Sequence, residues 1–97
     1  MTIRDFQYMI AIAEENNITK AAQRLYISQP SLSQALKKVE AELNATLFTR
    51  TNAGLVPTFI GEQFLIQAKE ILGSYRKLEH FISDVNNLQT GRLQIGV

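Results

Sequence analysis

A run of polar side chains on one predicted helix has the residue types and spacing needed to read the edges of DNA bases. The helix is predicted from residue 29 to about residue 43, with its apolar positions gathered on one side. The opposite side carries Pro30, Gln34 and Lys37, flanked by Ser33 and Lys38. A glutamine amide can pair with adenine N6 and N7, a serine hydroxyl can donate or accept, and a proline ring can pack on a thymine methyl group. Any surface helix also shows polar residues opposite its core, so plain solvent exposure is an equally open interpretation.

Positive charge gathers around this helix although the chain is close to neutral overall. Ten Lys and Arg residues against nine Asp and Glu residues give a net charge of +1. Residues 16–39 nevertheless contain no acidic residue and four basic ones, Lys20, Arg24, Lys37 and Lys38. Such a local excess is typical of a small surface that faces phosphate groups, and it is also compatible with an ordinary solvated face.

Catalytic and metal-binding chemistry has little support in the sequence. There is no cysteine, which excludes a disulfide, a thiol nucleophile and an iron–sulfur site. His80 is the single histidine and lies off the apolar seam of its helix, as expected for an exposed side chain rather than a metal ligand. Glu14 and Glu15 are adjacent, so their side chains diverge on a helix and form no carboxylate pair. We therefore expect no catalytic residue, no metal site and no enzyme activity in this chain.

Helix caps place the candidate reading helix second in a tightly linked pair. A first helix is predicted over residues 3–15 from its apolar spacing. Asn17 is suited to cap a short second helix, and Ser28 a third, with Pro30 in the first turn of that third helix. Two helices joined by a few residues, within a set of three, outline a helix-turn-helix at about residues 18–37.

A short ribbon and a long helix are predicted after this unit. Residues 48–57 read as two extended pieces around a turn that contains Asn and Gly. A long helix follows over residues 59–90, with a seam of apolar residues spaced alternately by four and three. The seam consists of Phe64, Ala68, Ile71, Tyr75, Leu78, Ile82 and Val85. This spacing predicts a coiled coil with a second helix. Residues 91–97 alternate like a first strand, so we expect the chain to be the front end of a longer protein.

The segment from Asn17 to Gln34 closely resembles the N-terminal domain of LysR-type transcriptional regulators. The resemblance rests on an alanine pair, a helix start, a Leu-Ser pair and a wing strand that occur in the family's order and spacing. These are Ala21-Ala22, Ser28-Gln29-Pro30, Leu32-Ser33 and Leu47-Phe48-Thr49-Arg50. Each piece alone is weak, but the combination is highly specific and covers essentially the whole chain.

The resemblance implies a mainly α fold in three parts. Residues 1–58 would form a winged helix-turn-helix of three helices plus a two-stranded β wing, with the wing at residues 48–57. Residues 59–90 would form a linker helix that pairs antiparallel with its twin in a homodimer. Residues 91–97 would begin an effector domain that binds a small-molecule co-inducer and drives assembly to tetramers, whereas no cofactor is expected within the chain itself.

The resemblance also assigns roles to individual side chains. Base reading in the major groove would fall to Gln29, Pro30, Ser33 and Gln34. Contact with the phosphate backbone would come from Thr19, Lys20, Ser28, Ser31 and Lys37 or Lys38, and Arg50 and Asn52 of the wing would lie along the backbone or minor groove.

The chain departs from the family pattern in two ways. Many members have arginine at the position of Gln34, and glutamine favours adenine where arginine favours guanine, so the half-site is expected to shift toward A·T at that base pair. Many members also carry a basic residue at the wing tip, where this chain has Thr51, Asn52 and Ala53. We therefore expect fewer ionic contacts and a shallower salt dependence than the family norm.

Sequence-specific binding of double-stranded DNA by a dimer, regulating bacterial transcription, is the leading interpretation. The alternative is a coiled-coil protein-interaction module that binds no DNA, which the near-neutral charge and the long seam favour. The sequence has no signal peptide or apolar run long enough to cross a bilayer, so we expect a cytoplasmic protein without membrane contact.

Overall fold

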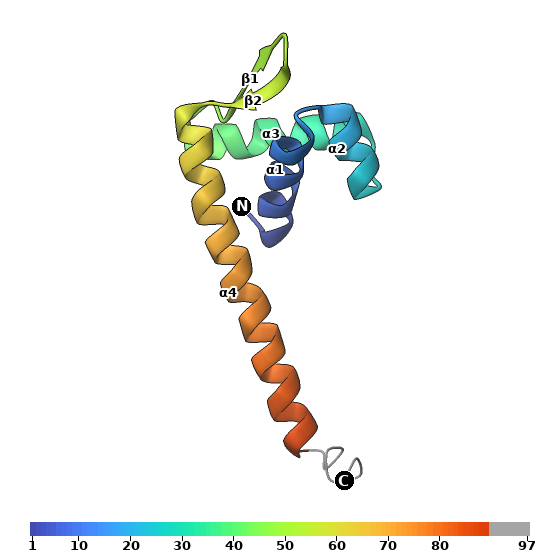
Figure 1. Ribbon diagram of the computed structural model, residues 1–97, viewed down its shortest axis with the longest axis vertical. Coiled ribbons are helices and arrows are strands. Elements are labelled where there is room, and N and C mark those ends of the chain that lie inside the picture. The colour runs from blue at the N-terminus through green and yellow to red at the C-terminus, as the bar shows by residue number, and fades with distance from the viewer. Residues whose placement is uncertain (90–97) are drawn as a thin grey trace.

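The structure is a computed structural model that describes residues 1–89 of the chain. It consists of a helical head, a projecting β-hairpin and one long helix that extends far beyond the head, with overall dimensions of 58 × 24 × 21 Å (Figure 1). The strand predicted at residues 91–97 lies outside the described residues. The predicted mainly α winged helix-turn-helix followed by a long helix is confirmed.

The first helix, α1 (Ile3–Glu15), begins and ends at polar caps close to the predicted positions. The Thr2 hydroxyl accepts a hydrogen bond from the Asp5 amide at 3.3 Å, and the Asp5 carboxylate accepts one from the Thr2 amide at 2.9 Å. This reciprocal capping box satisfies two amides that the helix leaves without partners. Asn16 ends α1 in the left-handed conformation, with φ of 54°.

The helix-turn-helix is formed by α2 (Ile18–Leu25) and α3 (Gln29–Leu43). Asn17 caps α2 and Ser28 caps α3, with Pro30 in the first turn, as the sequence predicted. Tyr26 adopts a left-handed conformation with φ of 60° and turns the chain between the two helices. The short link holds α2 and α3 in contact with each other and with α1.

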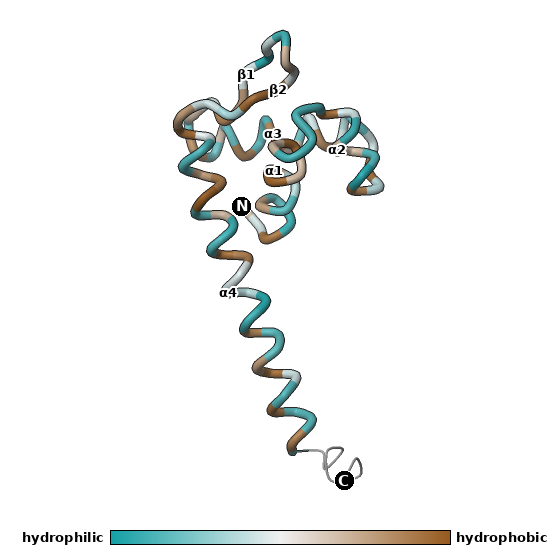
Figure 2. Tube along the Cα trace, in the orientation of Figure 1, coloured by the Kyte–Doolittle hydropathy of each residue, from teal (hydrophilic) through white to brown (hydrophobic). Residues whose placement is uncertain are grey.

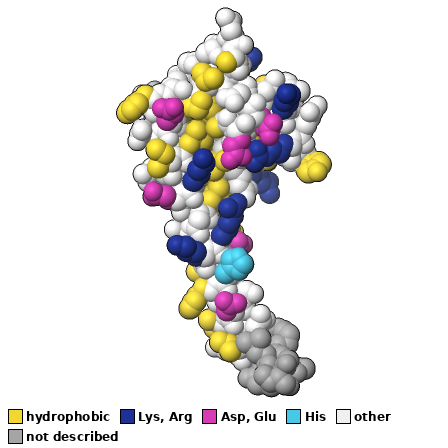
Figure 3. All heavy atoms as spheres, in the orientation of Figure 1, with side chains coloured by type: hydrophobic (Ala, Val, Ile, Leu, Met, Phe, Trp, Pro, Cys, Tyr) yellow, Lys and Arg dark blue, Asp and Glu magenta, His cyan; other side chains and the backbone are white. Residues whose placement is uncertain are grey.

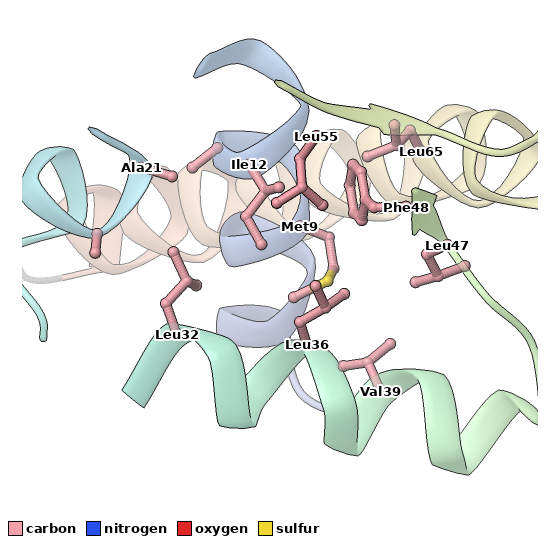
Figure 4. Packing of buried hydrophobic residues seen from close by; sticks show 12 residues of the cluster. Met9, Ile12, Ala21, Leu32, Leu36, Val39, Leu47, Phe48, Leu55 and Leu65 are labelled. Atoms are coloured by element: carbon pink, nitrogen blue, oxygen red, sulfur yellow. The ribbon is translucent and has the colours of Figure 1, made fainter. Parts of the chain in front are cut away.

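The hydrophobic core lies between the helices of the head and the root of the hairpin (Figure 4). The alanine pair Ala21 and Ala22 is buried, because small side chains let α2 approach its neighbours closely. In Figure 4 the apolar side chains of α3 point toward α1, whose Met9 and Ile12 are fully buried. The α3 residues that point into this core are Leu32, Leu36 and Val39. The side of α3 predicted to face the core does so.

The wing is an antiparallel hairpin of β1 (Phe48–Thr51) and β2 (Gly54–Pro57). Phe48 and Leu55 are buried in the core, so the root of the wing is part of the head. The rest of β1 and the turn are exposed and project away from it. Gly54 has φ of +104°, a conformation that only glycine adopts readily.

The long helix α4 (Phe59–Gln89) starts against the head and then leaves it. Thr58 begins the helix, because its hydroxyl accepts a hydrogen bond from the Gly61 amide at 2.9 Å. The early turns pack on α1, where the Phe6 and Phe64 ring centroids lie 5.9 Å apart. A side chain at Gly73 would touch nothing, so α4 has left the rest of the chain by this residue. We call residues 73–89 the tail. From here on, the head means residues 1–72, which include the wing and the first turns of α4.

The predicted heptad seam divides into a covered part and an exposed part. Ala68 is buried within the chain itself, and Phe64 packs against the head core. These two residues are therefore covered without a second molecule. The later seam residues Ile71, Tyr75, Leu78 and Ile82 are exposed, and Val85 is half-buried. Figure 2 shows apolar positions recurring along the polar tail. Among residues 1–89, no helix is both long and apolar enough to cross a membrane.

Candidate nucleic-acid interface

Serine side chains cap the exposed start of α3. The Ser28 hydroxyl accepts a hydrogen bond from the Ser31 amide at 3.2 Å and lies 2.8 Å from the Ser31 hydroxyl. Pro30 adds no amide that would need a partner, and all three residues are exposed. A helix N-terminus carries partial positive charge, which favours a nearby phosphate group. Both serine side chains are thus held in place on the surface, where the sequence predicts contact with the phosphate backbone of DNA.

The outward face of α3 carries the side chains that the sequence predicts to read bases. The Gln29 side chain donates a hydrogen bond to the Ser33 hydroxyl at 2.9 Å, so these two residues form an ordered pair, with Ser33 half-buried. Gln34 and Lys37 are exposed and make no side-chain hydrogen bond or ion pair within residues 1–89. Because the buried side of α3 is fixed in the core, the unpaired amide and ammonium groups point outward from a rigid support.

The start of α2 adds a second exposed polar site. The Asn17 side chain accepts a hydrogen bond from the Lys20 amide at 2.8 Å, which orders the first turn. Thr19 and Lys20 are exposed there, and the Lys20 ammonium has no ion pair in the described part of the chain. This turn can therefore supply a cation and a hydroxyl beside the helix that the sequence predicts to read bases.

The wing offers one cation and an ordered tip. Arg50 is exposed on β1 and pairs with no carboxylate within residues 1–89. The Thr51 hydroxyl donates to the Gly54 carbonyl at 3.0 Å and accepts from the Ala53 amide at 3.1 Å. Asn52 is exposed between them. These two hydrogen bonds stabilise the turn. The turn itself has no charged side chain.

Not all four basic residues of the acid-free stretch are free to meet phosphate. Arg24 lies 2.6 Å from the Glu14 carboxylate and 3.2 Å from the Glu15 carboxylate. Its hydrogen bonds to these two carboxylates raise the pKa of Arg24. Glu14 and Glu15 lie just before the acid-free stretch in sequence, but α1 and α2 bring them onto it in space. The interpretation of Arg24 as part of a basic surface is therefore corrected.

Lys38 also has a partner within the fold. Its ammonium lies 3.9 Å from the Asp5 carboxylate, whose side chain is only 8% exposed. The Lys38 side chain is itself 60% exposed, so this contact is loose and leaves room for rotation. Of the basic residues predicted to contact the backbone, Lys20, Lys37 and Arg50 are unpaired among the described residues, and Lys37 is a better candidate than Lys38. Figure 3 shows acidic and basic side chains side by side on the head.

The structure places eleven of the twelve predicted DNA-facing residues on the exposed surface, with Ser33 half-buried. They divide among three elements: the start of α2, the first half of α3, and the wing. Their contacts with DNA remain predictions. No cluster of three side chains suited to hold a metal occurs among the residues that the structure describes.

Sequence reasoning missed one residue that connects the end of α1 to the wing. The sequence predicts that the first helix ends at residue 15 and gives Asn16, the next residue, no further role. In the structure its side-chain amide donates a hydrogen bond to the Leu55 carbonyl of β2 at 3.2 Å. The asparagine itself signals a left-handed helix end, but nothing local identifies a partner 39 residues away.

Comparison with known proteins gives a consistent result. Residues 3–62 match the family described as bacterial regulatory helix-turn-helix protein, lysR family. The chain is similar to the uncharacterized HTH-type transcriptional regulator YcgK of Bacillus subtilis (strain 168), with 38% identity over 97 residues, 100% of this chain. The chain spans only 30% of the length of that relative.

Two solved complexes with DNA share the fold. The complex of BenM_DBD with catB site 1 DNA is 30% identical with a TM-score of 0.85, covering 89% of this chain and 97% of that one. The CbnR_DBD–DNA complex is 34% identical with a TM-score of 0.78, covering 88% of this chain and 99% of that one. In both, the similarity extends over almost the whole of a chain that was solved with DNA.

Proposed function

Because the chain belongs to the lysR family of bacterial regulatory helix-turn-helix proteins, we propose that it binds double-stranded DNA sequence-specifically and so regulates transcription. One observation carries the proposal. An ordered helix start and an unpaired amide and ammonium group stand on the outer face of α3, in a chain whose fold matches two proteins solved with DNA.

In the proposed complex, the first half of α3 lies in the major groove. Gln34 would pair with the edge of an adenine, and Pro30 would meet an apolar base edge. The ordered Gln29–Ser33 pair would present hydroxyl and amide groups beside them. Backbone contacts from Lys20 and Lys37 would set the register of α3 without reading sequence.

The wing would contact the DNA next to the position of α3. Arg50 supplies the cation for this contact, whereas the tip from Thr51 to Ala53 has none. An uncharged tip gives no cation to insert into a narrow minor groove. We therefore assign the wing a backbone contact through Arg50, supplemented by Asn52.

The tail supports a homodimer as the DNA-binding species. Its apolar side chains Tyr75, Leu78, Phe81, Ile82 and Leu88 are between 41% and 63% exposed. Exposed apolar residues at heptad spacing are buried most simply by a second helix of the same kind. Antiparallel pairing of two tails would hold two heads apart and match them to an inverted repeat. A tetramer, and a co-inducer bound to an effector domain beyond residue 90, are further expectations for a longer protein.

Selection of binding sequences from a random duplex pool tests the proposal. We expect an inverted repeat in which the base pair facing Gln34 is A·T, and the spacing of its half-sites would report the geometry of the paired tails. Enrichment of a lone half-site would support DNA reading but contradict the dimer. If no sequence is enriched while sedimentation shows a dimer, the proposed function is overturned.

A dimer that enriches no DNA sequence would favour the second candidate, a coiled-coil interaction module. The specific observation in its favour is the exposed apolar tail, which such a module would use without DNA. The two candidates differ in their response to salt. Affinity of a DNA reader falls steeply as salt rises, because phosphate contacts release counterions, whereas a module that binds only protein has no duplex affinity to lose.

A further inference from the structure

Asn16 connects three elements of the head. It ends α1 with φ of 54° and ψ of 23°, and its backbone amide donates a hydrogen bond to the Ile12 carbonyl at 2.9 Å. The next residue, Asn17, caps α2. The left-handed conformation therefore bends the chain directly between the end of one helix and the start of another.

Asn16 also binds the wing through a reciprocal pair of hydrogen bonds. The Leu55 amide donates to the Asn16 carbonyl at 3.0 Å, and the Asn16 side-chain amide donates to the Leu55 carbonyl at 3.2 Å. Leu55 lies opposite Arg50 in the hairpin. Asn16 thus satisfies two polar groups of β2 that face away from β1, in the manner of a one-residue third strand.

The contact is close enough to require glycine on the wing side. A Cβ at Gly54 would overlap the backbone carbonyl oxygen of Asn16, and the φ of +104° independently disfavours a side chain. Gly54 and Leu55 are therefore both pressed against the turn between α1 and α2. The wing cannot tilt toward that turn without a clash.

We propose that Asn16 is a positioning residue that fixes the angle of the wing to the helix-turn-helix and so places Arg50 on the DNA backbone. This inference rests on the proposed function. Asn16 adjoins the turn that carries Lys20, and its bond partner Leu55 faces Arg50 across the hairpin. The hydrogen bonds between Asn16 and Leu55 thus connect the start of α2 to the wing, which are two of the three elements that carry the predicted DNA contacts.

The side-chain amide of Asn16 can be removed while the fold is kept. Glycine at residue 16 keeps the left-handed conformation and the backbone carbonyl but loses the side-chain donor. Phe48 and Leu55 remain in the core, so the root of the wing stays attached. DNA would then have to order a wing that Asn16 orders in the free protein. We expect the Asn16→Gly variant to bind its DNA site about 2- to 10-fold more weakly.

Asn44 offers a matched control for this substitution. It ends α3 in the same conformation, with φ of 51°, and its side chain makes no hydrogen bond to the rest of residues 1–89. Asn44→Gly therefore repeats the backbone change without touching the wing. Circular dichroism and thermal unfolding would establish that both variants fold.

Hydroxyl-radical footprinting on the selected site distinguishes positioning from general loss of stability. In Asn16→Gly we expect weaker protection where the wing lies and unchanged protection and base preference beneath α3. In a chain that already carries Arg50→Ala, the Asn16→Gly substitution should have a much smaller effect, because Arg50 supplies the main contact that Asn16 positions. Gly54→Ala, which pushes on the same contact from the other side, should reproduce the selective loss.

Three results would overturn the inference. They are equal affinity and footprint for Asn16→Gly, Asn44→Gly and the unmodified chain, an even loss over the whole site, or an Asn16→Gly effect that persists unchanged in the Arg50→Ala background. Each of these three results is obtained by comparison with an unmodified chain that binds DNA. If the unmodified chain enriches no sequence at all, the proposed function fails first, so the two failures are distinguishable.

Discussion

The head has a buried apolar core, whereas no side chain of the tail, residues 73–89, is buried. In the head, Met9, Ile12 and Leu32 are fully buried within one chain. In the tail, Leu78 and Phe81 are 57% and 63% exposed although they recur at regular helical spacing. Figure 3 shows such side chains along the lower end of the molecule. The head therefore has a core within one chain, whereas the tail would find a partner surface only in the proposed homodimer.

The largest effect is expected from removing a buried side chain of the head. Leu32→Ala deletes a side chain with 0% exposure and leaves a cavity in the core of the head, so the free energy of unfolding should fall by about 3 kcal/mol. Urea denaturation followed by circular dichroism measures this loss. The same substitution at Tyr75 in the tail serves as the control, and an equal loss of head stability there would contradict the division into two regions.

A charge in the tail should separate the two copies without unfolding the head. Leu78→Lys places an ammonium group in the exposed seam, so sedimentation should show a monomer. Affinity for a palindromic DNA site should fall by about 100-fold, since two linked heads bind far more tightly than one. His80→Lys puts the same charge on the other side of α4 and should leave the dimer intact. A Leu78→Lys monomer that still binds the full site with unchanged affinity would exclude this coupling.

Within the head, the next effect concerns a single side chain that is proposed to read bases. Gln34→Ala should cost about 1–3 kcal/mol of binding free energy for each occupied half-site and should relax the preference at one base pair. Competition binding with duplexes varied at that base pair measures both. Gln23→Ala, an exposed glutamine of α2, is the control. Equal losses on specific and random DNA would show that Gln34 does not read bases.

The smallest effect separates free cations from paired ones. Lys37→Ala should weaken binding to all duplexes alike and reduce the salt slope by about 1 for each subunit, because one phosphate contact is lost. Arg24→Ala removes the same charge from a residue held by Glu14 and Glu15 and should leave the slope nearly unchanged. Titration at several salt concentrations compares the two, and a larger effect from Arg24 would restore it to the basic surface.

The local structure of the head was predictable because short-range chemistry determines it. Asn17 and Ser28 cap the helices that follow them, and the spacing of Leu32, Leu36 and Val39 identifies the buried side of α3. These signals lie within a few residues of the structure that they specify. The wing likewise follows from its turn residues.

Contacts between distant segments were not predictable from the same signals. The bond from Asn16 to Leu55 depends on how the wing packs, and the pairing of Arg24 with Glu14 and Glu15 depends on the angle between α1 and α2. The heptad seam was identified by its period alone. That period continues through Phe64 and Ala68, which the head covers, and spacing cannot tell which partner a stripe will meet.

Equilibrium binding to the selected duplex and to a scrambled duplex of equal composition, over a range of salt concentrations, tests the central claim most directly. We predict that the chain binds the selected duplex at least about 1,000-fold more tightly than the scrambled one, and that both affinities fall steeply as salt rises. Equal affinity for the two duplexes, or no binding to either by a folded dimer, would contradict the assignment of α3 as a reader of DNA sequence.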